Sequence, residues 1–375
     1  MKKSTIVTVL IIILIGIMIT DINLSGSGVF ELFFRRLETN SIHDIGIDFN
    51  TNAKYEYSVE KNLNIAKDSR NELVINNSLG SIEIIGEERN DIDIKAKITV
   101  YSSEKEVGRD YAENIDISPL KNTSSIIINS PENNLEEVKG VKIDYIIKAP
   151  QEMYLDLYNQ HGKLEVSNFL NGVDLSNKYK ETIVEDINGE KIKISAKYGK
   201  LYLSEIGNNG DELEVNTAYS SSTINNVNRN LKIDASYGEL DLNNISGKID
   251  SRLRYGEAYF YNIGEMTLDS RYTKVKIDEI DGKLKAYTDY GSITVDDVKY
   301  DTLIEGRYTE ISVELAKELS NYVFEGKTEY GDIKTNLEVK QEKRDQMKIA
   351  TFEKGSGDKK ISLRTEHENI NIRQN

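Results

Sequence analysis

From residue 161 to about residue 331, short runs of alternating apolar and polar residues recur at a nearly constant interval. In one unit, residues 231–236 alternate up to Tyr237, and the alternation resumes over residues 239–242. Alternation with a period of two predicts a β-strand that has one apolar and one polar face. Each unit is therefore predicted to form two short strands, one on either side of a tyrosine.

These tyrosines mark the repeat, because they follow one another at intervals of 17 to 22 residues, most often 18. His161 fits one interval before the first tyrosine, and His367 is expected to take the same place in a last, irregular unit. A repeat this short predicts a stacked architecture. We predict an all-β fold, a single-chain parallel β-solenoid with β-helix-like coils of about 18 residues, whose strands lie about 4.8 Å apart. The tyrosines are Tyr179, Tyr198, Tyr219, Tyr237, Tyr255, Tyr272, Tyr290, Tyr308 and Tyr330.

The tyrosines share parity with the inward apolar residues, which predicts a ladder of rings at one corner, with the hydroxyls at the rim. The next residue is a glycine at positions 162, 199, 238, 256, 291 and 331, and we expect it to supply positive φ at the corner. Two positions before the tyrosine the residue is usually small, which would make room for the ring. A second corner is expected at turn dipeptides such as Asn188-Gly189, Ser246-Gly247 and Asp281-Gly282.

The flanking parts follow the same pattern less regularly. Residues 51–70 are read as an entry strand, and Ser103 to Glu106 has the form of a capping box that opens a short helix to about Asn114. The strands Lys360–Arg364 and Asn369–Ile372 are polar, and we expect them to close the end of the solenoid. Further strands are predicted at residues 73–75, 79–84, 92–98, 115–117, 126–128 and 141–148.

The N-terminus begins Met1-Lys2-Lys3 and continues with an apolar run to Thr20. Basic residues before an apolar run are typical of a signal anchor or a signal peptide, which we assign to residues 1–20. The lysines place the N-terminus in the cytoplasm. The predicted location is the cell membrane, single-pass, with the C-terminal domain extracytoplasmic; secretion after signal cleavage is the alternative. A stem or entry segment (21–69), an irregular β-solenoid part (70–150) and the regular solenoid with its C-terminal cap (151–375) would follow.

The composition narrows the choice of partners. The net charge is −15, with 63 acidic and 48 basic residues. This argues against a nucleic-acid partner, because phosphate contacts need clustered lysine and arginine. There is no cysteine, which excludes disulfides and thiolate metal sites.

Three segments resemble a known bacterial family: residues 79–86, residues 146–150 running into residues 155–157, and the glycine-containing repeats that follow. The family is DUF4097, whose members are labelled as candidate adhesins, and the resemblance covers about residues 70–373. It implies a single-chain β-solenoid on the extracytoplasmic side and no established catalytic residues. Some members of related families lie beside envelope-stress regulators.

Candidate chemistry is sparse. Acidic clusters at Asp278-Glu279-Asp281, Asp296-Asp297 and Glu185-Asp186 offer the oxygen ligands that calcium prefers, but the glycine-rich nonapeptide of calcium-binding β-rolls is missing. We read them as solvated turns. His43, His161 and His367 lie far apart in sequence, and carboxylates are spread over nearly every coil. We therefore assign no catalytic, metal or cofactor-binding residue and expect no cofactor.

Some tyrosines point outward by parity and could stack on sugars or on a partner. Tyr202 and Tyr259 each lie four residues after a repeat tyrosine and should share one surface column. Tyr261 and Tyr287 are the other two candidates.

The sequence predicts a non-enzymatic, membrane-anchored surface module of the adhesin type, with a protein or glycan partner at the cell envelope. One alternative is a sensor or scaffold subunit of an envelope-stress system, which would place a partner surface near Phe30 to Arg36. A less favoured alternative is a polysaccharide-active enzyme, for which three or more carboxylates or basic groups should converge on one groove.

Overall fold

The computed structural model describes residues 53–131, 135–207, 210 and 212–374. Within them, Lys54–Asn375 form one compact unit. The predicted membrane segment (1–20), the Phe30–Arg36 segment and His43 lie outside the described residues and stay predictions, as do the proposed domain boundaries. No helix in the described part of the chain is long and apolar enough to span a membrane.

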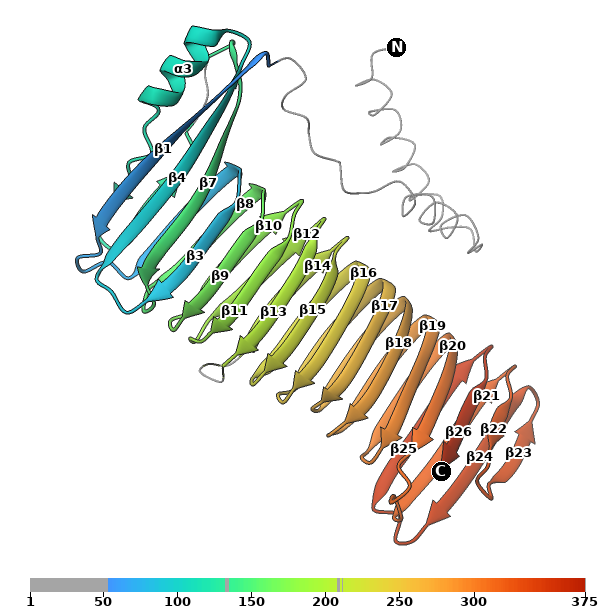
Figure 1. Cartoon of the computed structure of the whole chain (residues 1–375). Helices are drawn as coiled ribbons and strands as arrows, with labels where there is room; N and C mark the ends of the chain where they lie inside the picture. The colour runs from blue at the N-terminus through green and yellow to red at the C-terminus, as the bar shows by residue number, and fades with distance from the viewer. Residues whose placement is uncertain (1–52, 132–134, 208–209, 211, 375) are drawn as a thin grey trace, which may run out of the picture. The chain divides into compact units, whose positions relative to one another are not determined.

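The unit is built from strands stacked side by side, with the helix α3 (Lys105–Asn114) near its N-terminal end (Figure 1). The all-β prediction is confirmed. The strands are β1 (Tyr55–Ala66), β2 (Glu72–Leu79), β3 (Ile82–Glu87), β4 (Asp91–Ser102), β5 (Leu120–Lys121), β6 (Ser125–Asn129), β7 (Val138–Pro150), β8 (Tyr154–His161), β9 (Leu164–Phe169), β10 (Val173–Lys178), β11 (Thr182–Ile187), β12 (Ile192–Lys197), β13 (Lys200–Ile206), β14 (Glu212–Ala218), β15 (Ser221–Val227), β16 (Asn230–Ile245), β17 (Ile249–Ile263), β18 (Met266–Ile280), β19 (Leu284–Val298), β20 (Thr302–Leu315), β21 (Tyr322–Glu329), β22 (Ile333–Thr335), β23 (Lys340–Arg344), β24 (Met347–Lys354), β25 (Lys359–Glu366) and β26 (Ile370–Gln374).

Each regular coil contributes one strand to each of two parallel ladders. The first ladder contains β8, β10, β12 and β14, and the second contains β9, β11, β13 and β15. From β16 to β20 one long strand bends at its tyrosine and belongs to both ladders. Leu231 pairs with Ile249, and Ile249 with Met266, so one coil is 17 or 18 residues long, as predicted.

The core lies between the two ladders. Inward residues such as Ile233 and Leu242 are buried and belong to one hydrophobic cluster that runs through the whole unit. Burying one such side chain contributes about 1.5–3 kcal/mol, and neighbouring coils supply most of the cover. The members of this cluster among the described residues come from residues 65–372, so the unit carries a continuous core of its own, which is what independent folding requires.

The N-terminal part departs from a parallel solenoid. β1 pairs antiparallel with β4, and β4 pairs antiparallel with β7. The helix is confirmed, but the capping box is wrong: the N-cap is Glu104, without a side-chain hydrogen bond, while the Ser103 hydroxyl donates to the carbonyl oxygen of Glu137 at 3.3 Å. The strand predicted at residues 115–117 is also wrong: Ile115 and Ile117 are buried, but the stretch joins no ladder.

The C-terminal strands do not close the stack, which corrects the prediction. β25 lies between β20 and β21, and β26 lies between β20 and β22. The last coil of the chain is therefore inserted one place before the end. β24 pairs antiparallel with β21, and β23 with β24, so that this hairpin covers the edge that the polar strands were expected to cover. The prediction followed the order of the strands in the sequence, whereas their order in the stack is set by which strands pair with each other.

Candidate functional site

One corner of the solenoid carries an unbroken stack of eleven aromatic rings, which we call the aromatic column. Consecutive rings have centroids 4.5–5.2 Å apart and planes inclined by 2–12°. The predicted tyrosine ladder is thus confirmed. In stacking order the rings are His161, Tyr179, Tyr198, Tyr219, Tyr237, Tyr255, Tyr272, Tyr290, Tyr308, His367 and Tyr330.

The rings lie outside the core, and not inside it as their parity suggested. Every repeat tyrosine has positive φ, for example 57° at Tyr255 and 53° at Tyr272. A residue in the left-handed region breaks the alternation of a strand and turns its side chain out at the corner. Tyr255 is 40 % exposed and Tyr330, at the end of the column, 58 %. The left-handed conformation costs an L-residue about 1–2 kcal/mol, which stacking on two neighbours offsets.

The glycines after the tyrosines serve close packing and do not supply the positive φ we expected. A Cβ on Gly256 would lie 2.0 Å from the carbonyl oxygen of Gly238, and one on Gly238 would lie 2.0 Å from that of Ser220. Where this position carries serine or threonine, the hydroxyl is used inside the corner. Thr309, for instance, donates to the carbonyl oxygen of Thr288 at 3.1 Å.

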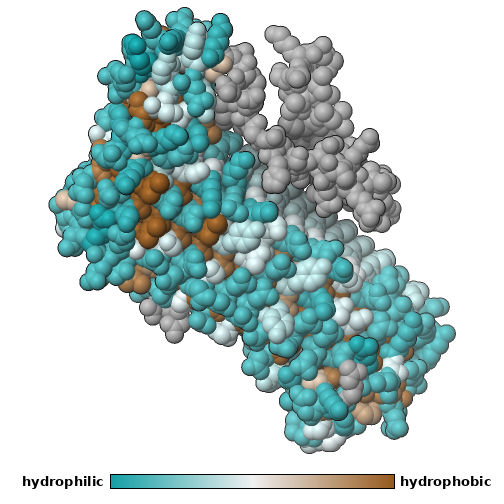
Figure 2. Space-filling view, viewed as in Figure 1, coloured by the Kyte–Doolittle hydropathy of each residue, from teal (hydrophilic) through white to brown (hydrophobic). Residues whose placement is uncertain are grey.

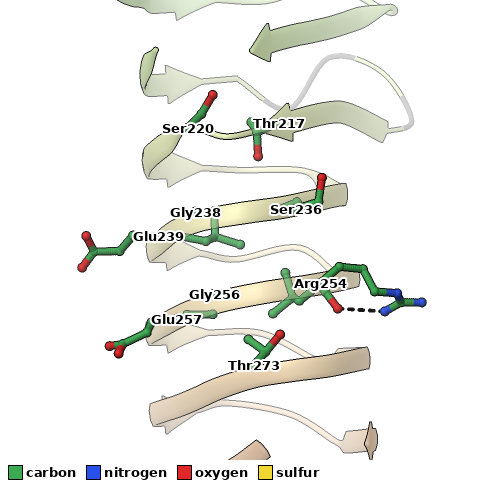
Figure 3. A pocket seen from close by; sticks show the side chains of 13 residues that line it. Thr217, Ser220, Ser236, Gly238, Glu239, Arg254, Gly256, Glu257 and Thr273 are labelled. Carbon is green, nitrogen blue, oxygen red and sulfur yellow. Dashed lines mark hydrogen bonds between the residues drawn. The ribbon is translucent and has the colours of Figure 1, made fainter. Parts of the chain in front are cut away.

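A void of about 10 Å³ lies behind this corner, with Thr217, Ser220 and Thr273 among its lining residues (Figure 3). The small residues two positions before the tyrosines do not make room for the ring, which corrects our prediction. They face the core side: Ala196 and Ser270, for example, are both buried.

Stacking determines what the column offers to a partner. Each inner ring has both faces covered by its neighbours, so ring edges and hydroxyls meet the solvent. Burial raises the pKa of Tyr219, Tyr237 and Tyr272, and neighbouring tyrosine hydroxyls add to the effect. These hydroxyls remain protonated at neutral pH and can donate as well as accept hydrogen bonds.

A second left-handed column was missed by the sequence analysis. It falls seven residues after each of the first eight rings and is formed by Asn168, Asp186, Glu205, Asn226, Asn244, Asn262, Glu279 and Asp297. Asn262 donates to Asn244 at 2.9 Å, and Asn244 donates to Asn226 at 3.0 Å. The sequence did carry a signal for this column, namely the recurrence of asparagine and aspartate, which tolerate the left-handed conformation. The predicted turns follow two residues later at Asn188, Ser246 and Asp281.

The outward tyrosines are placed as predicted but do not form one cluster. Tyr202 and Tyr259 share a column of the second ladder, with Thr223 and Asp241 between them. Tyr259 donates its hydroxyl to Glu257 at 2.6 Å, and Tyr202 is exposed. Tyr261 and Tyr287 are exposed on different ladders.

The acidic clusters are brought together only in part. Asp278 pairs with Asp296 in the second ladder, and Lys276 lies 2.7 Å from Asp278 and 3.7 Å from Asp296. Burial and the neighbouring Asp278 raise the pKa of Asp296. Among the residues that the structure describes, no group of three or more acidic or histidine side chains could hold a metal ion. His161 and His367 both belong to the aromatic column but lie far apart in it.

An open groove of about 430 Å³ crosses the outer face of the first ladder beside the aromatic column. Tyr287 lies in it, together with Asp269, Asp289, Glu305, Glu366, Arg271, Arg307 and Arg364. Arg307 binds Asp289 through two nitrogens at 2.9 and 3.1 Å and, by this hydrogen bond, lowers the pKa of that carboxyl. Figure 2 shows a surface that is mainly hydrophilic on the side in view, with separate apolar patches.

One segment of the chain matches a known protein family. No curated protein matches the chain. A solved structure described as a candidate cell adhesion protein from Clostridium sporogenes is 10 % identical, with 85 % of this chain and 100 % of the other covered and a TM-score of 0.17. A candidate adhesin from Bacteroides fragilis is 12 % identical, with 84 % and 97 % covered and a TM-score of 0.24. Residues 261–373 match the family model described as Toastrack DUF4097, which confirms the resemblance over this segment of the chain.

Proposed function

We propose that this chain is a non-enzymatic interaction module of the cell surface, of the adhesin type. Its N-terminal segment would hold it in the cell membrane, with the solenoid outside the cytoplasm. The observation that carries the proposal is the aromatic column: a continuous row of half-exposed rings, held on a stack of hydrogen-bonded strands. Tyrosine is enriched in protein interfaces because it offers a large contact area and a hydrogen-bonding group at low entropic cost.

The choice of residue at the two corners supports a role beyond folding. Both corners need the left-handed conformation, and the second one takes mainly asparagine, aspartate and glutamate. These polar residues satisfy the backbone without an aromatic ring. The first corner instead places an aromatic ring in every regular coil and leaves much of it in the solvent. A continuous aromatic edge is more than the turn requires, so we assign it to contact with a partner.

The groove beside Tyr287 supports a second candidate, the binding of a polysaccharide. Its carboxylates and guanidinium groups converge, as expected for a sugar-directed site, and the exposed ring of Tyr287 offers a face on which a sugar can stack. Asp289, however, is kept ionised by Arg307, whereas hydrolysis needs a carboxylic acid that stays protonated. The groove therefore suits binding better than cleavage. Loss of oligosaccharide binding in Tyr287→Ala, and release of reducing ends by the unaltered chain, would separate the two.

The proposed function is tested by capture from crosslinked cells, with the full chain and the 54–375 unit used in parallel. Recovery of envelope glycan or surface protein by both supports the adhesin-type function. Recovery of one and the same membrane protein by both would identify a scaffold or sensor of an envelope system instead. If neither is retained on cells or on purified envelope, the proposal is wrong.

A further inference from the structure

The two ends of the aromatic column carry opposite charge. We consider the flanking residues from one position before each ring to two positions after it. Around the first three rings these are five lysines and one glutamate, a net charge of +4: Lys163, Lys178, Lys180, Lys197, Lys200 and Glu181. Around the last three rings they are five carboxylates and one arginine, a net charge of −4: Glu310, Glu329, Asp332, Glu366, Glu368 and Arg307.

Most of these charges are available to a partner. Lys163 pairs with Glu165 at 2.8 Å, Asp332 with Lys348, and Arg307 with Asp289. The structure records no ion pair, in the part of the chain it describes, for the other four lysines or for the four glutamates at the opposite end. Of these eight side chains, Lys178 contacts the Tyr158 hydroxyl at 3.5 Å and Glu310 accepts a hydrogen bond from Asn371 at 3.1 Å. The same chain thus presents, along one edge, a basic patch and an acidic patch in which most charges lie outside recorded ion pairs.

We propose that two copies of this chain associate through their aromatic columns in an antiparallel arrangement. A second copy is the partner whose ring spacing matches at every step, since both columns advance by 4.5–5.2 Å per ring. A parallel arrangement would bring basic ends together and acidic ends together. The antiparallel arrangement has a two-fold axis and brings each basic end onto an acidic one, twice over.

The register follows from the order of the rings. Tyr255 is the sixth of the eleven, so it lies at the two-fold axis and faces its own counterpart. Tyr179 then faces His367 of the second copy, which brings Lys178 and Lys180 opposite Glu366 and Glu368. The coils near the middle carry little net charge, and their tyrosine hydroxyls can exchange hydrogen bonds across the axis.

The size of this surface predicts a weak contact. Ten steps of the column span roughly 50 Å, and four flanking residues of extended chain span about 13 Å. The contact area is then roughly 650 Å² per copy, near the lower end for stable complexes. Because the charges lie at the surface, the contact should weaken with salt. In the antiparallel pair the two N-terminal ends lie at opposite ends of the contact. With the proposed membrane anchoring, the two copies would belong to two different cells, and only this step rests on the proposed function.

The test is sedimentation velocity on the 54–375 unit, with the full chain in parallel, at about 50 mM and about 500 mM salt. The unaltered protein should dimerise, with the dissociation constant rising at least tenfold at high salt. One variant combines Lys178→Glu with Lys197→Glu, and another combines Glu329→Lys with Glu366→Lys. Each alone should dimerise at least tenfold more weakly. Mixed together they should form a heterodimer as strong as the original, because their reversed ends are again complementary.

A control variant, Lys232→Glu with Lys285→Glu, reverses two exposed charges at the far end of the first-ladder strands and should dimerise normally. Restoration by mixing shows that each variant is folded, and both keep a strongly negative net charge, so that non-specific attraction does not explain it. A protein that stays monomeric at about 1 mM, or variants that dimerise unchanged, or a mixture without heterodimer, overturns the proposal. A monomer that still binds purified envelope would leave the proposed function intact.

Discussion

The ring of Tyr308 stacks on that of His367, with centroids 4.5 Å apart and planes inclined by 4°. Tyr330, the next tyrosine of the repeat, lies one place further along and stacks on the other face of His367 at 4.8 Å. The last coil of the chain is therefore built into the stack between two coils made earlier in the sequence. The aromatic column continues across this point without a gap, although the chain does not.

Deleting residues 358–375 should therefore do more than shorten the solenoid. It removes the partner of both β20 and β21, so the segment from β21 to β24 loses its parallel contact with the stack. We expect amide exchange in residues 322–354 to become fast while strands β9 to β17 keep their protection. Hydrogen exchange read by mass spectrometry measures this. Retained protection of β21 would show that this segment folds without the inserted coil.

The left-handed tyrosines can be tested at the centre of the column. Tyr255→Asn and Tyr255→Val both lose two stacking contacts, but asparagine tolerates positive φ and a β-branched residue does not. The valine variant should have a free energy of unfolding about 1–2 kcal/mol lower than the asparagine variant. Urea unfolding of the two variants side by side gives the difference. Equal stabilities would mean that the backbone at this corner is not held in the left-handed region.

Gly256 and Thr273 occupy the same place in neighbouring coils, which provides a matched pair. Gly256→Ala puts a Cβ against the backbone carbonyl of Gly238 and should lower the melting temperature strongly, because the backbone of the preceding coil must move. Thr273→Ala keeps its Cβ and loses one hydrogen bond to the carbonyl oxygen of Arg271, which should cost about 1 kcal/mol. Thermal melts of both variants suffice. A Gly256 variant as stable as the Thr273 variant would contradict the close approach.

His161 predicts a pH dependence. Burial lowers its pKa below the ordinary 6.5, and Lys178 and Lys180 lower it further. The unfolded chain then binds a proton more readily than the folded one, so the contribution to stability is complete above pH 6.5 and is lost as the pH falls below it. His161→Tyr extends the tyrosine column and should remove this part of the slope. Urea midpoints at pH 7.5 and 5.5 compare the two proteins, and identical slopes would contradict the assignment.

The repeat allowed much of this structure to be predicted, and its failures have physical causes. A period of two places strands such as β16 and β17 correctly, and the interval between tyrosines gives the coil length. The alternation of apolar and polar residues placed the tyrosine rings on the core side of the strands. One left-handed residue such as Tyr255 reverses this alternation, and the apolar pattern of the sequence does not show it. The inserted coil was missed because β25 is polar, like an end strand, and pairing between distant segments leaves no local signal. The groove beside Tyr287 draws residues from four strands, which alternation alone cannot bring together.

We expect the aromatic column to be the surface by which this protein makes contact. The most direct measurement is retention of the 54–375 unit on whole cells, compared between two variants. One carries Tyr255→Asn, Tyr272→Asn and Tyr290→Asn in the column, and the other carries Tyr202→Asn, Tyr259→Asn and Tyr261→Asn on the second ladder. The column variant should lose retention at least tenfold, while the second-ladder variant should be retained like the unaltered protein. Full retention of the column variant, in a folded state shown by its circular dichroism, would mean that the contact is made elsewhere on the molecule.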